Sequence, residues 1–381
     1  MGYKFLGDIA KLRNENIKDN SDDSLLYVTT AHLLPEKRGL DSNLESSLNK
    51  SGKHFYKGDI LVSNIRPYFK KIWFATSDGI TSNDVLIFTP KEGVDLSYLY
   101  YLLMQDTFFD YATKTSKGTK MPRGDKSALK QFEVYIPKLE MQVGTSKKLK
   151  SFDKKIETNN AIIANLEAQA QAIFKSRFVD FEPFQDGQFV ESELGMIPEG
   201  WEVKTLGDFF PVITGKKNAN IAIDNGEYPF FTCSQGIFYT DDYSFDANAI
   251  LLAGNGDFNV KRYNGKFEAY QRTYILIPYD EKYVGLLYNL IEFYLPQIVS
   301  GHKGSVINYI TKGMIEEFKF AVPNDIPAKT LKLFNDYENF IAHLKKEVKN
   351  LEITRDTLLP KLMSGEIRVG QDDIEEIENL L

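Results

Sequence analysis

The chain has 381 residues, enough for two or three domains, and its 43% hydrophobic and 26% charged residues are typical of a globular protein. Its single cysteine, Cys233, excludes an intrachain disulfide and a cysteine-based zinc site, and its four histidines are far apart in sequence. No apolar run approaches the length that crosses a membrane, so we expect a cytoplasmic protein with no bound metal.

The net charge of −7 is distributed unevenly along the chain. Residues 1–141 carry +2, 142–180 carry +3, 181–325 carry −9 and 326–381 carry −3. The acidity therefore lies almost wholly in the third segment and the tail. It does not exclude a nucleic-acid partner, because phosphates are met by local basic patches.

Residues 1–141 predict a β-rich first domain. Short apolar runs at 60–62, 85–88 and 134–136 are typical of strands, and residues 95–112 between the second and third runs have a helical pattern. We expect a curved sheet with one or two helices packed against it.

Two polar clusters of this domain are candidate DNA contacts, because Arg, Lys, Asn and Ser on loops read base edges and phosphates. The alternative for both clusters is ordinary solvated surface. The first directly follows a strand and comprises Ser63, Asn64, Arg66, Tyr68, Lys70 and Lys71. The second, in a glycine-containing loop after the helical segment, comprises Lys114, Lys117, Thr119, Lys120 and Arg123.

Residues 142–180 predict a long helix with a heptad seam, because apolar residues recur in alternating steps of three and four. Asn159 fills the one position of this seam that is not apolar. The apolar seam residues are Leu149, Phe152, Ile156, Ile163, Leu166, Ala170 and Ile173.

Residues 181–325 predict a second domain that repeats the first. Leu206-Gly207-Asp208 matches Leu6-Gly7-Asp8, and residues 303–323 align without a gap to 117–137. By this repeat the candidate DNA contacts of the second domain are Asn255, Asn259, Lys261, Arg262, Tyr263, His302, Lys303 and Ser305, with Lys216 and Lys217 in a nearby loop.

Residues 326–366 predict a second long helix, followed by an acidic tail at 367–381. Arg355 occupies one slot of its seam, and the seam superposes on the first at an offset of 185 residues. We expect the two helices to pair as an antiparallel coiled coil within one chain, with dimerisation of two chains as the alternative. The apolar or aromatic seam residues are Phe334, Tyr337, Ile341, Leu344, Val348, Leu351, Leu358 and Leu362.

The expected fold class is therefore α+β: two β-rich target-binding domains separated by two long helices, with a pseudo-two-fold internal repeat. Two related but different domains at a fixed separation suit a partner with repeating geometry, and duplex DNA is the leading candidate. The site would be bipartite and asymmetric. The rival hypothesis is a scaffold that does not bind DNA, with two peptide- or sugar-binding domains clipped together by the coiled coil.

Three stretches carry a resemblance to a known family. The run "SELGMIPEGWEVKTLGDF", the strand end "FEVYIPKLEMQ" and the helix end "IFKSRFVDFEPF" resemble the specificity subunits of type I restriction–modification systems. The resemblance covers essentially the whole chain. It departs from the family at the entry to the second helix, "AVPNDIPAKTLKLF", which lacks a Glu-Gln pair.

This resemblance implies a non-catalytic protein with two target-recognition domains, whose paired helices bind two DNA adenine methyltransferase subunits. Those subunits would hold S-adenosylmethionine, so no cofactor is expected in this chain, and nuclease or translocase subunits could join the complex. The sequence itself lacks the Asn/Asp-Pro-Pro-aromatic signature of adenine methyltransferases and a phosphate-binding loop. The run "AGNGDFN" from Ala253 has two glycines but not the third of a dinucleotide-binding motif.

Overall fold

The computed structural model describes residues 2–18, 22, 24–41, 44–48, 50–224, 226–300 and 309–367. The chain folds into two compact units. The first comprises residues 1–158 together with the chain from Val348 onward, and the second comprises Asn159–Glu347. Each unit therefore contains part of the N-terminal long helix and part of the C-terminal one.

A four-stranded antiparallel sheet forms the centre of the first unit. Its order is β2 (Ala10–Arg13), β10 (Val85–Pro90), β7 (Ile60–Ser63) and β8 (Ile72–Phe74). The side chains of β7 and β10 alternate between two hydrophobic cores. Ile60, Val62, Leu86 and Phe88 enter one core, and Leu61, Val85 and Ile87 enter the other. Because both faces are covered, both strands are mostly apolar, with the buried Ser63 and Thr89 as the polar exceptions.

Different elements cover the two faces of this sheet. The first core is completed by α2 (Leu96–Met104), α3 (Asp106–Lys114) and residues of the long helices. The second core is completed by Val28, Leu33, Phe55 and Ala75. A five-stranded sheet supplies part of this cover, in the order β3 (Asn16–Ile17), β6 (Gly52–Phe55), β9 (Gly79–Thr81), β4 (Leu26–Val28) and β5 (Glu45–Ser46).

The second unit repeats this two-faced arrangement. Ile250, Leu252 and Leu276 pack into the core that contains α6 (Val284–Ser300), whereas Ala249, Leu251 and Ile275 pack against Phe231 and Phe267. Its sheet has six strands, in the order β15 (Val212–Thr214), β20 (Thr273–Leu276), β18 (Phe245–Ala253), β19 (Val260–Ala269), β16 (Tyr228–Phe231) and β17 (Phe238–Thr240).

Two small sheets show the repeat in its backbone hydrogen bonds. β1 (Gly2–Phe5) pairs with β11 (Glu133–Ile136), and β14 (Trp201–Thr205) pairs with β21 (Lys319–Pro323), both antiparallel. The Leu6 amide donates to the Phe132 carbonyl over 2.8 Å, and the Leu206 amide donates to the Phe318 carbonyl over 3.0 Å. Each matching Leu-Gly-Asp motif therefore docks at the start of the strand that leads to a long helix.

The run between the first long helix and β14 forms a hairpin of β12 (Phe189–Ser192) and β13 (Gly195–Pro198). Trp201 follows it, and its ring lies 5.2 Å from the Phe181 ring and 5.1 Å from the Phe184 ring. This aromatic cluster ties the end of the helix to the second domain.

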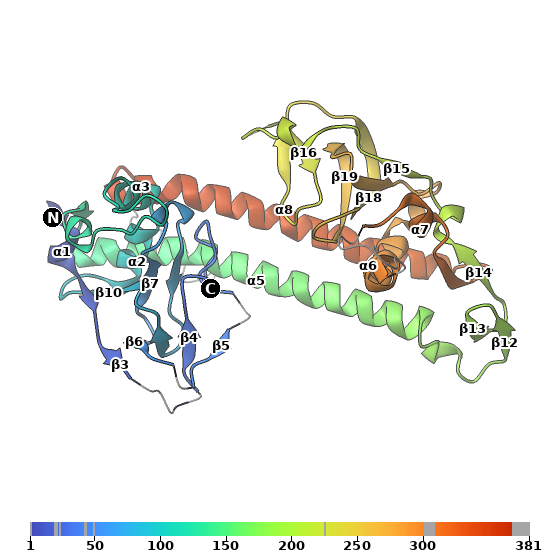
Figure 1. Cartoon of the computed structure of the whole chain (residues 1–381), viewed down its shortest axis with the longest axis horizontal. Coiled ribbons are helices and arrows are strands. Elements are labelled where there is room, and N and C mark those ends of the chain that lie inside the picture. The colour runs from blue at the N-terminus through green and yellow to red at the C-terminus, as the bar shows by residue number, and fades with distance from the viewer. Residues whose placement is uncertain are drawn as a thin grey trace. The chain divides into compact units, whose positions relative to one another are not determined.

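The long helices are α5 (Leu139–Phe178) and α8 (Ala328–Ser364), and in each unit part of one packs against part of the other (Figure 1). In the second unit Asn159 Nδ2 donates to Glu347 Oε2 over 2.9 Å, and the Tyr337 hydroxyl donates to Gln169 Oε1 over 2.9 Å. The later residue of α5, Gln169, contacts the earlier residue of α8, Tyr337, so the two helices run antiparallel.

The seam residues face the inside of this pairing. Asn159, the polar seam residue, is only 1% exposed. The buried apolar members are Leu149, Ile156, Ile163, Ala170, Phe334, Ile341, Leu344 and Leu362. The half-buried members are Phe152, Leu166, Ile173, Tyr337, Val348, Leu351 and Leu358.

The predicted fold class is confirmed: the chain is mixed α+β, with two β-rich domains and two long helices packed together. The predicted boundaries at 141, 180, 325 and 366 stay predictions, since the compact units divide the chain within the helices instead.

The seam should dominate the stability of the helix pair. We expect Ile341→Ala to lower the free energy of unfolding by roughly 2–5 kcal/mol, because it removes a buried side chain and leaves a cavity. The neighbouring Phe340→Ala is the control, since Phe340 is 49% exposed and should change stability by less than about 0.5 kcal/mol. Urea unfolding of both variants measures this; equal losses would contradict a buried seam at Ile341.

Candidate nucleic-acid interface

In the first unit the two predicted clusters meet in space. The Arg66 amide donates to the Pro122 carbonyl over 2.8 Å, and the Gly124 amide donates to the Asn64 carbonyl over 3.0 Å. Lys117 and Arg123 exchange backbone hydrogen bonds of 2.8 and 2.9 Å, which closes the second cluster into a small loop. Two segments about 60 residues apart in sequence therefore form one surface, which we call the first loop pair (residues 63–71 and 114–124).

The backbone of the first loop pair is strained. Arg66 and Lys70 flank the short helix η1 (Pro67–Phe69) with φ of 48° and 51°, a left-handed conformation that is costly for residues other than glycine. Glu36 and Lys37 share it, with φ of 55° and 59°, and their amides donate to Phe69 and Lys70 carbonyls. Such strain persists only where the surroundings hold it, and it is concentrated at functional sites.

The side chains of the first loop pair fall into two groups. Ser63 and Asn64 are buried, and Lys71 Nζ donates to the Thr30 carbonyl over 2.7 Å. Lys70 Nζ lies 3.0 Å from Asp106 Oδ1, which also binds Lys37. The exposed group comprises Tyr68, Lys114, Lys117, Thr119, Lys120 and Arg123.

Two polar atoms of this surface are unusual. Asn64 Oδ1 and Arg66 Nε are buried and have no hydrogen-bond partner among the residues that the structure describes. A Cβ at Gly124 would lie 2.8 Å from Asn64 Oδ1, so glycine is what allows the loop to close over the amide. An unsatisfied buried polar atom costs free energy, and a ligand that supplies a partner would recover it.

The second unit holds an equivalent backbone pairing at the end of β18. Asn255 forms a bridge with Tyr309, as Ile65 does with Arg123 in the first unit. The Ile310 amide donates to the Gly254 carbonyl over 2.9 Å. We call residues 253–259 with 309–310 the second loop pair. His302, Lys303 and Ser305, predicted as DNA contacts, lie outside the described residues.

The other residues of the second unit that were predicted to contact DNA do not lie together on one surface. Asn259 is buried and donates to the Cys233 carbonyl over 3.1 Å, and Lys261 Nζ donates to the Ser234 carbonyl over 2.7 Å. Arg262 instead contacts the helices, donating from Nη2 to Asn339 Oδ1 of α8 over 3.0 Å. Tyr263 packs in the core beside Phe231.

The two lysines of the second unit that were predicted to lie in a loop, Lys216 and Lys217, differ in exposure. Lys216 is exposed, whereas Lys217 is half-buried and forms a parallel bridge with Tyr270. The Gln271 amide donates to the Lys217 carbonyl over 2.9 Å. Lys216 is therefore the freer of the two to contact a phosphate.

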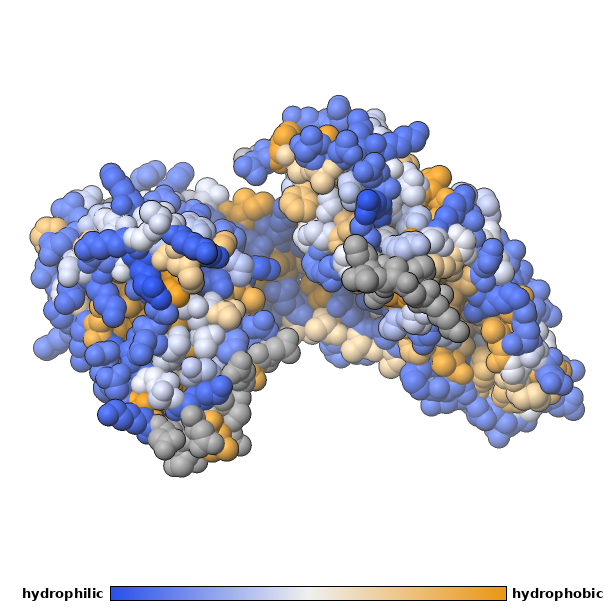
Figure 2. All heavy atoms as spheres, in the orientation of Figure 1, coloured by the Kyte–Doolittle hydropathy of each residue, from blue (hydrophilic) through white to orange (hydrophobic). Residues whose placement is uncertain are grey.

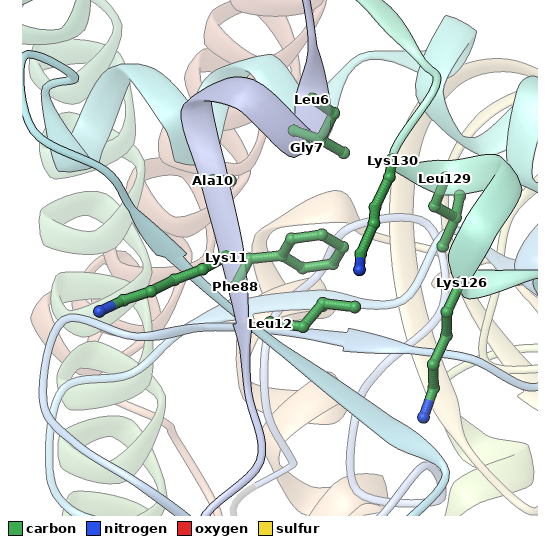
Figure 3. A pocket seen from close by; sticks show the side chains of 9 residues that line it. All are labelled: Leu6, Gly7, Ala10, Lys11, Leu12, Phe88, Lys126, Leu129 and Lys130. Atoms are coloured by element: carbon green, nitrogen blue, oxygen red, sulfur yellow. The ribbon is translucent and has the colours of Figure 1, made fainter.

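A group of lysines beside the first loop pair was not predicted from the sequence. A shallow hollow with an apolar floor of Leu6, Leu12, Phe88 and Leu129 is bordered by Lys11, Lys126 and Lys130, all three exposed. Lys126 and Lys130 lie on and just after α4 (Lys126–Leu129), and the side chains of Lys11 and Lys126 extend away from the hollow (Figure 3). The four-residue spacing of Lys126 and Lys130 on a short helix was the signal that could have indicated them.

A buried lysine supports the same surface from beneath. Lys53 Nζ donates to the Asn83 carbonyl over 3.3 Å and to the Val85 carbonyl. Between them lies Asp84, whose carbonyl accepts from the Asn64 amide and whose carboxylate binds Arg123. Burial lowers the pKa of the Lys53 ammonium to about 8. Lys53 is thus held by carbonyls and fixes the segment on which the first loop pair rests.

Other kinds of site find no support in the described ranges. No group of three His, Cys, Asp or Glu residues there could hold a metal ion, and no helix there has the length and apolar character that a bilayer requires. The apolar atoms on the face shown in Figure 2 lie in small patches among hydrophilic ones, as suits a polar partner.

Comparison with known proteins decides the family. The model of the type I restriction modification DNA specificity domain matches residues 1–168 and 198–354. The chain belongs to this family of specificity subunits. It is therefore the non-catalytic DNA-specificity component of a type I restriction–modification system.

Individual relatives agree with this assignment. The specificity subunit is 31% identical to the MjaIX specificity subunit of Methanocaldococcus jannaschii, over 83% of this chain and 79% of the relative. It is 38% identical to the EcoDI specificity subunit of Escherichia coli, but over only 45% of this chain and 40% of that subunit. The S subunit from M. genitalium shares the fold, with a TM-score of 0.63, 16% identity and 95% of both chains covered.

Lys53 predicts a pH dependence of stability. The unfolded chain keeps the lysine protonated up to about pH 10.5, whereas the folded chain releases the proton near pH 8, so stability should rise with pH across this window. We expect the difference in unfolding free energy between the native specificity subunit and Lys53→Met to change by about 1–3 kcal/mol from pH 8 to 10.5. Denaturant titrations at several pH values measure it, with Lys57→Met at an exposed neighbour as control. A difference that does not vary with pH would contradict the buried ammonium.

Proposed function

We propose that this specificity subunit recognises a bipartite, asymmetric site in duplex DNA, with one loop pair reading each half. The observation that carries this proposal is the repeated backbone pairing of Ile65 with Arg123 and of Asn255 with Tyr309. The same backbone pairing in both loop pairs supports the same kind of DNA contact in both domains. The different side chains on the two loop pairs support recognition of two different half-sites.

The proposed partners are two adenine methyltransferase subunits, which bind S-adenosylmethionine and act on opposite strands; nuclease or translocase subunits could join them. The two-fold repeat of the helices supports a pair of like partners. The helices also expose apolar side chains that a partner could cover, at Ile162, Phe340 and Ile353.

The charge distribution fits a shared interface with DNA. Residues 181–325 carry −9, so the second domain is poorly suited to neutralise phosphates by itself. In this proposal the methyltransferase supplies much of that neutralisation, and the second domain reads bases. Its affinity for DNA outside the complex would then be low and weakly dependent on salt.

The test is to express the specificity subunit with the methyltransferase encoded beside it and to map methylated adenines in the host DNA. The proposal requires methylation at a single bipartite motif with unread base pairs between two unequal halves. Methylation that is absent without this chain and present with it assigns specificity to it. Methylation at a continuous motif, or no dependence on this chain, would contradict the proposal.

The halves of the motif can be assigned to the loop pairs by two matched substitutions. We expect Arg66→Ala to weaken recognition of one half-site by about 1–3 kcal/mol, because a base contact of an arginine is worth that much. Asn255→Ala, at the position of the second unit that corresponds to Ile65 beside Arg66, should affect the other half. Methylation rates on substrates with single base changes measure both effects. A uniform loss at both halves from either variant would count against this assignment.

The helices should set the length of the unread spacer. The α5 and α8 helices continue through Thr158–Asn159 and Glu347–Val348, where the chain passes from one unit to the other. Deleting residues 156–162 from α5 and 346–352 from α8 removes one heptad from each and preserves both seams. A heptad spans about 10 Å, so the spacer should shorten by about 3 base pairs with both half-sites retained.

Methylation mapping of the doubly deleted subunit measures the spacer. Deletion of the heptad from α5 alone is the control, since it breaks the register and should abolish methylation. An unchanged spacer in an active double deletion would refute the role of the helices as a ruler.

A further inference from the structure

In each unit a polar contact joins the β-rich domain to the long helices, and the two contacts lie at corresponding positions of the repeat. In the first unit the Tyr101 hydroxyl of α2 donates to Asp153 Oδ2 of α5 over 2.6 Å. Arg355 Nη1 of α8 donates to the other oxygen of Asp153 over 2.7 Å. Three elements therefore meet at one carboxylate, which is paired with a cation.

The second unit places a different contact at this step. Asn289 Nδ2 of α6 donates to Glu338 Oε1 of α8 over 3.0 Å, and Gln171 Nε2 of α5 donates to Asn289 Oδ1 over 3.1 Å. Glu338 and Asp153 are 185 residues apart, the offset that relates the two seams. An amide here takes the central place that the carboxylate takes in the first unit.

Among the residues that the structure describes, Glu338 has no ion-pair partner, whereas Asp153 has Arg355. Asn289 is 1% exposed and Glu338 is 6% exposed, so the contact is shielded from water. Arg262 is near enough to act on the charge of Glu338, but it donates hydrogen bonds to Asn248 and Asn339. Its Nη1 is buried without a partner among the described residues.

The surroundings of Glu338 disfavour its charged form. Burial raises the pKa of Glu338 to about 7, although the hydrogen bond from Asn289 and nearby positive charges act in the opposite direction. The charged and titratable groups around this contact come from four elements: Tyr288 and Glu292 of α6, Arg262 of β19, Glu167 of α5 and Lys345 of α8.

The position of α6 matters for recognition because α6 leads into the second loop pair. The helix ends at Ser300, and the chain returns to the sheet at Tyr309, where it bridges Asn255. Only a short stretch of chain joins α6 to Tyr309, so a shift of α6 on the long helices would act on the second loop pair.

We propose that Glu338 is a positioning residue that holds the second domain on the long helices when protonated and releases it when ionised, whereas the matching contact of the first unit has the Arg355 guanidinium as its counter-charge. An arginine stays protonated throughout the physiological pH range, so this counter-charge is kept. A buried carboxylate with one amide donor needs further hydrogen-bond donors when it ionises, and water can reach it only if α6 moves. Recognition of the second half-site should therefore relax above about pH 7, while that of the first half-site does not.

The first test does not involve DNA. Spin labels are placed at the exposed positions Asp242 and Lys346 of the full chain, with Cys233→Ser, and the label distance is measured at pH 6 and pH 8. We expect the distribution to broaden or shift at pH 8 in the chain with Glu338 and to stay unchanged with Glu338→Gln, which keeps an acceptor for Asn289 but cannot ionise. A pH response that survives Glu338→Gln, or no response in either chain, would overturn the proposal.

The second test uses the methyltransferase complex and rests on the proposed function. We expect discrimination against single base changes in the second half-site to fall about tenfold between pH 6 and pH 8. This is the effect expected if docking of the second domain changes the pKa of Glu338 by about one unit. Glu338→Gln should abolish this fall. Asp153→Asn, the matched control, should weaken the first half-site equally at both pH values.

The two tests separate two kinds of failure. If the label distances respond as expected but no bipartite site is methylated, the positioning role stands and the proposed function fails. If a bipartite site is methylated but its second half is read equally at both pH values, the positioning role is overturned and the proposed function stands.

Discussion

The fold depends on the burial of one narrow apolar stripe on each of two long helices. A single helix with such a stripe would expose it to water, and helical stability in proteins comes mainly from packing of that face. The α5 and α8 helices solve this by pairing with each other. The polar residues within the stripes are satisfied across the pair, Asn159 by Glu347 and Arg355 by Asp153. Polar groups of this kind cost stability but fix register, because any slip would leave them buried without partners.

The features that the sequence predicted are those with a local signal. The heptad seams are visible because each position repeats within one helix. The strands β7 and β10 are visible because burial on both faces makes 60–62 and 85–88 continuous apolar runs. The repeat of Leu-Gly-Asp is likewise local, and it marks the same docking point in each unit. These signals sufficed for the fold class and the family.

The candidate interface was harder to predict from the sequence because it is formed by segments that are far apart along the chain. That residues 63–71 meet residues 114–124 depends on hydrogen bonds between distant segments, such as Arg66 to Pro122, which no spacing rule announces. The direction of a strand side chain is equally hidden. Arg262 has the chemistry of a base reader, but it lies on the side of β19 that faces α8. The ammonium of Lys53 is held by the backbone carbonyls of Asn83 and Val85, and nothing in the sequence around Lys53 indicates these partners.

On the proposed function, the repeat explains how one fold could serve two unlike half-sites. Backbone hydrogen bonds fix the loop pairs in both units and do not depend on side-chain identity, so the side chains on them are free to diverge. The contacts beneath the domains have diverged as well, from an arginine–carboxylate pair at Asp153 to an amide and a lone carboxylate at Glu338. The main-chain hydrogen bonds thus keep the frame of the repeat, while the side chains on the loop pairs and the contacts between each domain and the long helices differ between the two units.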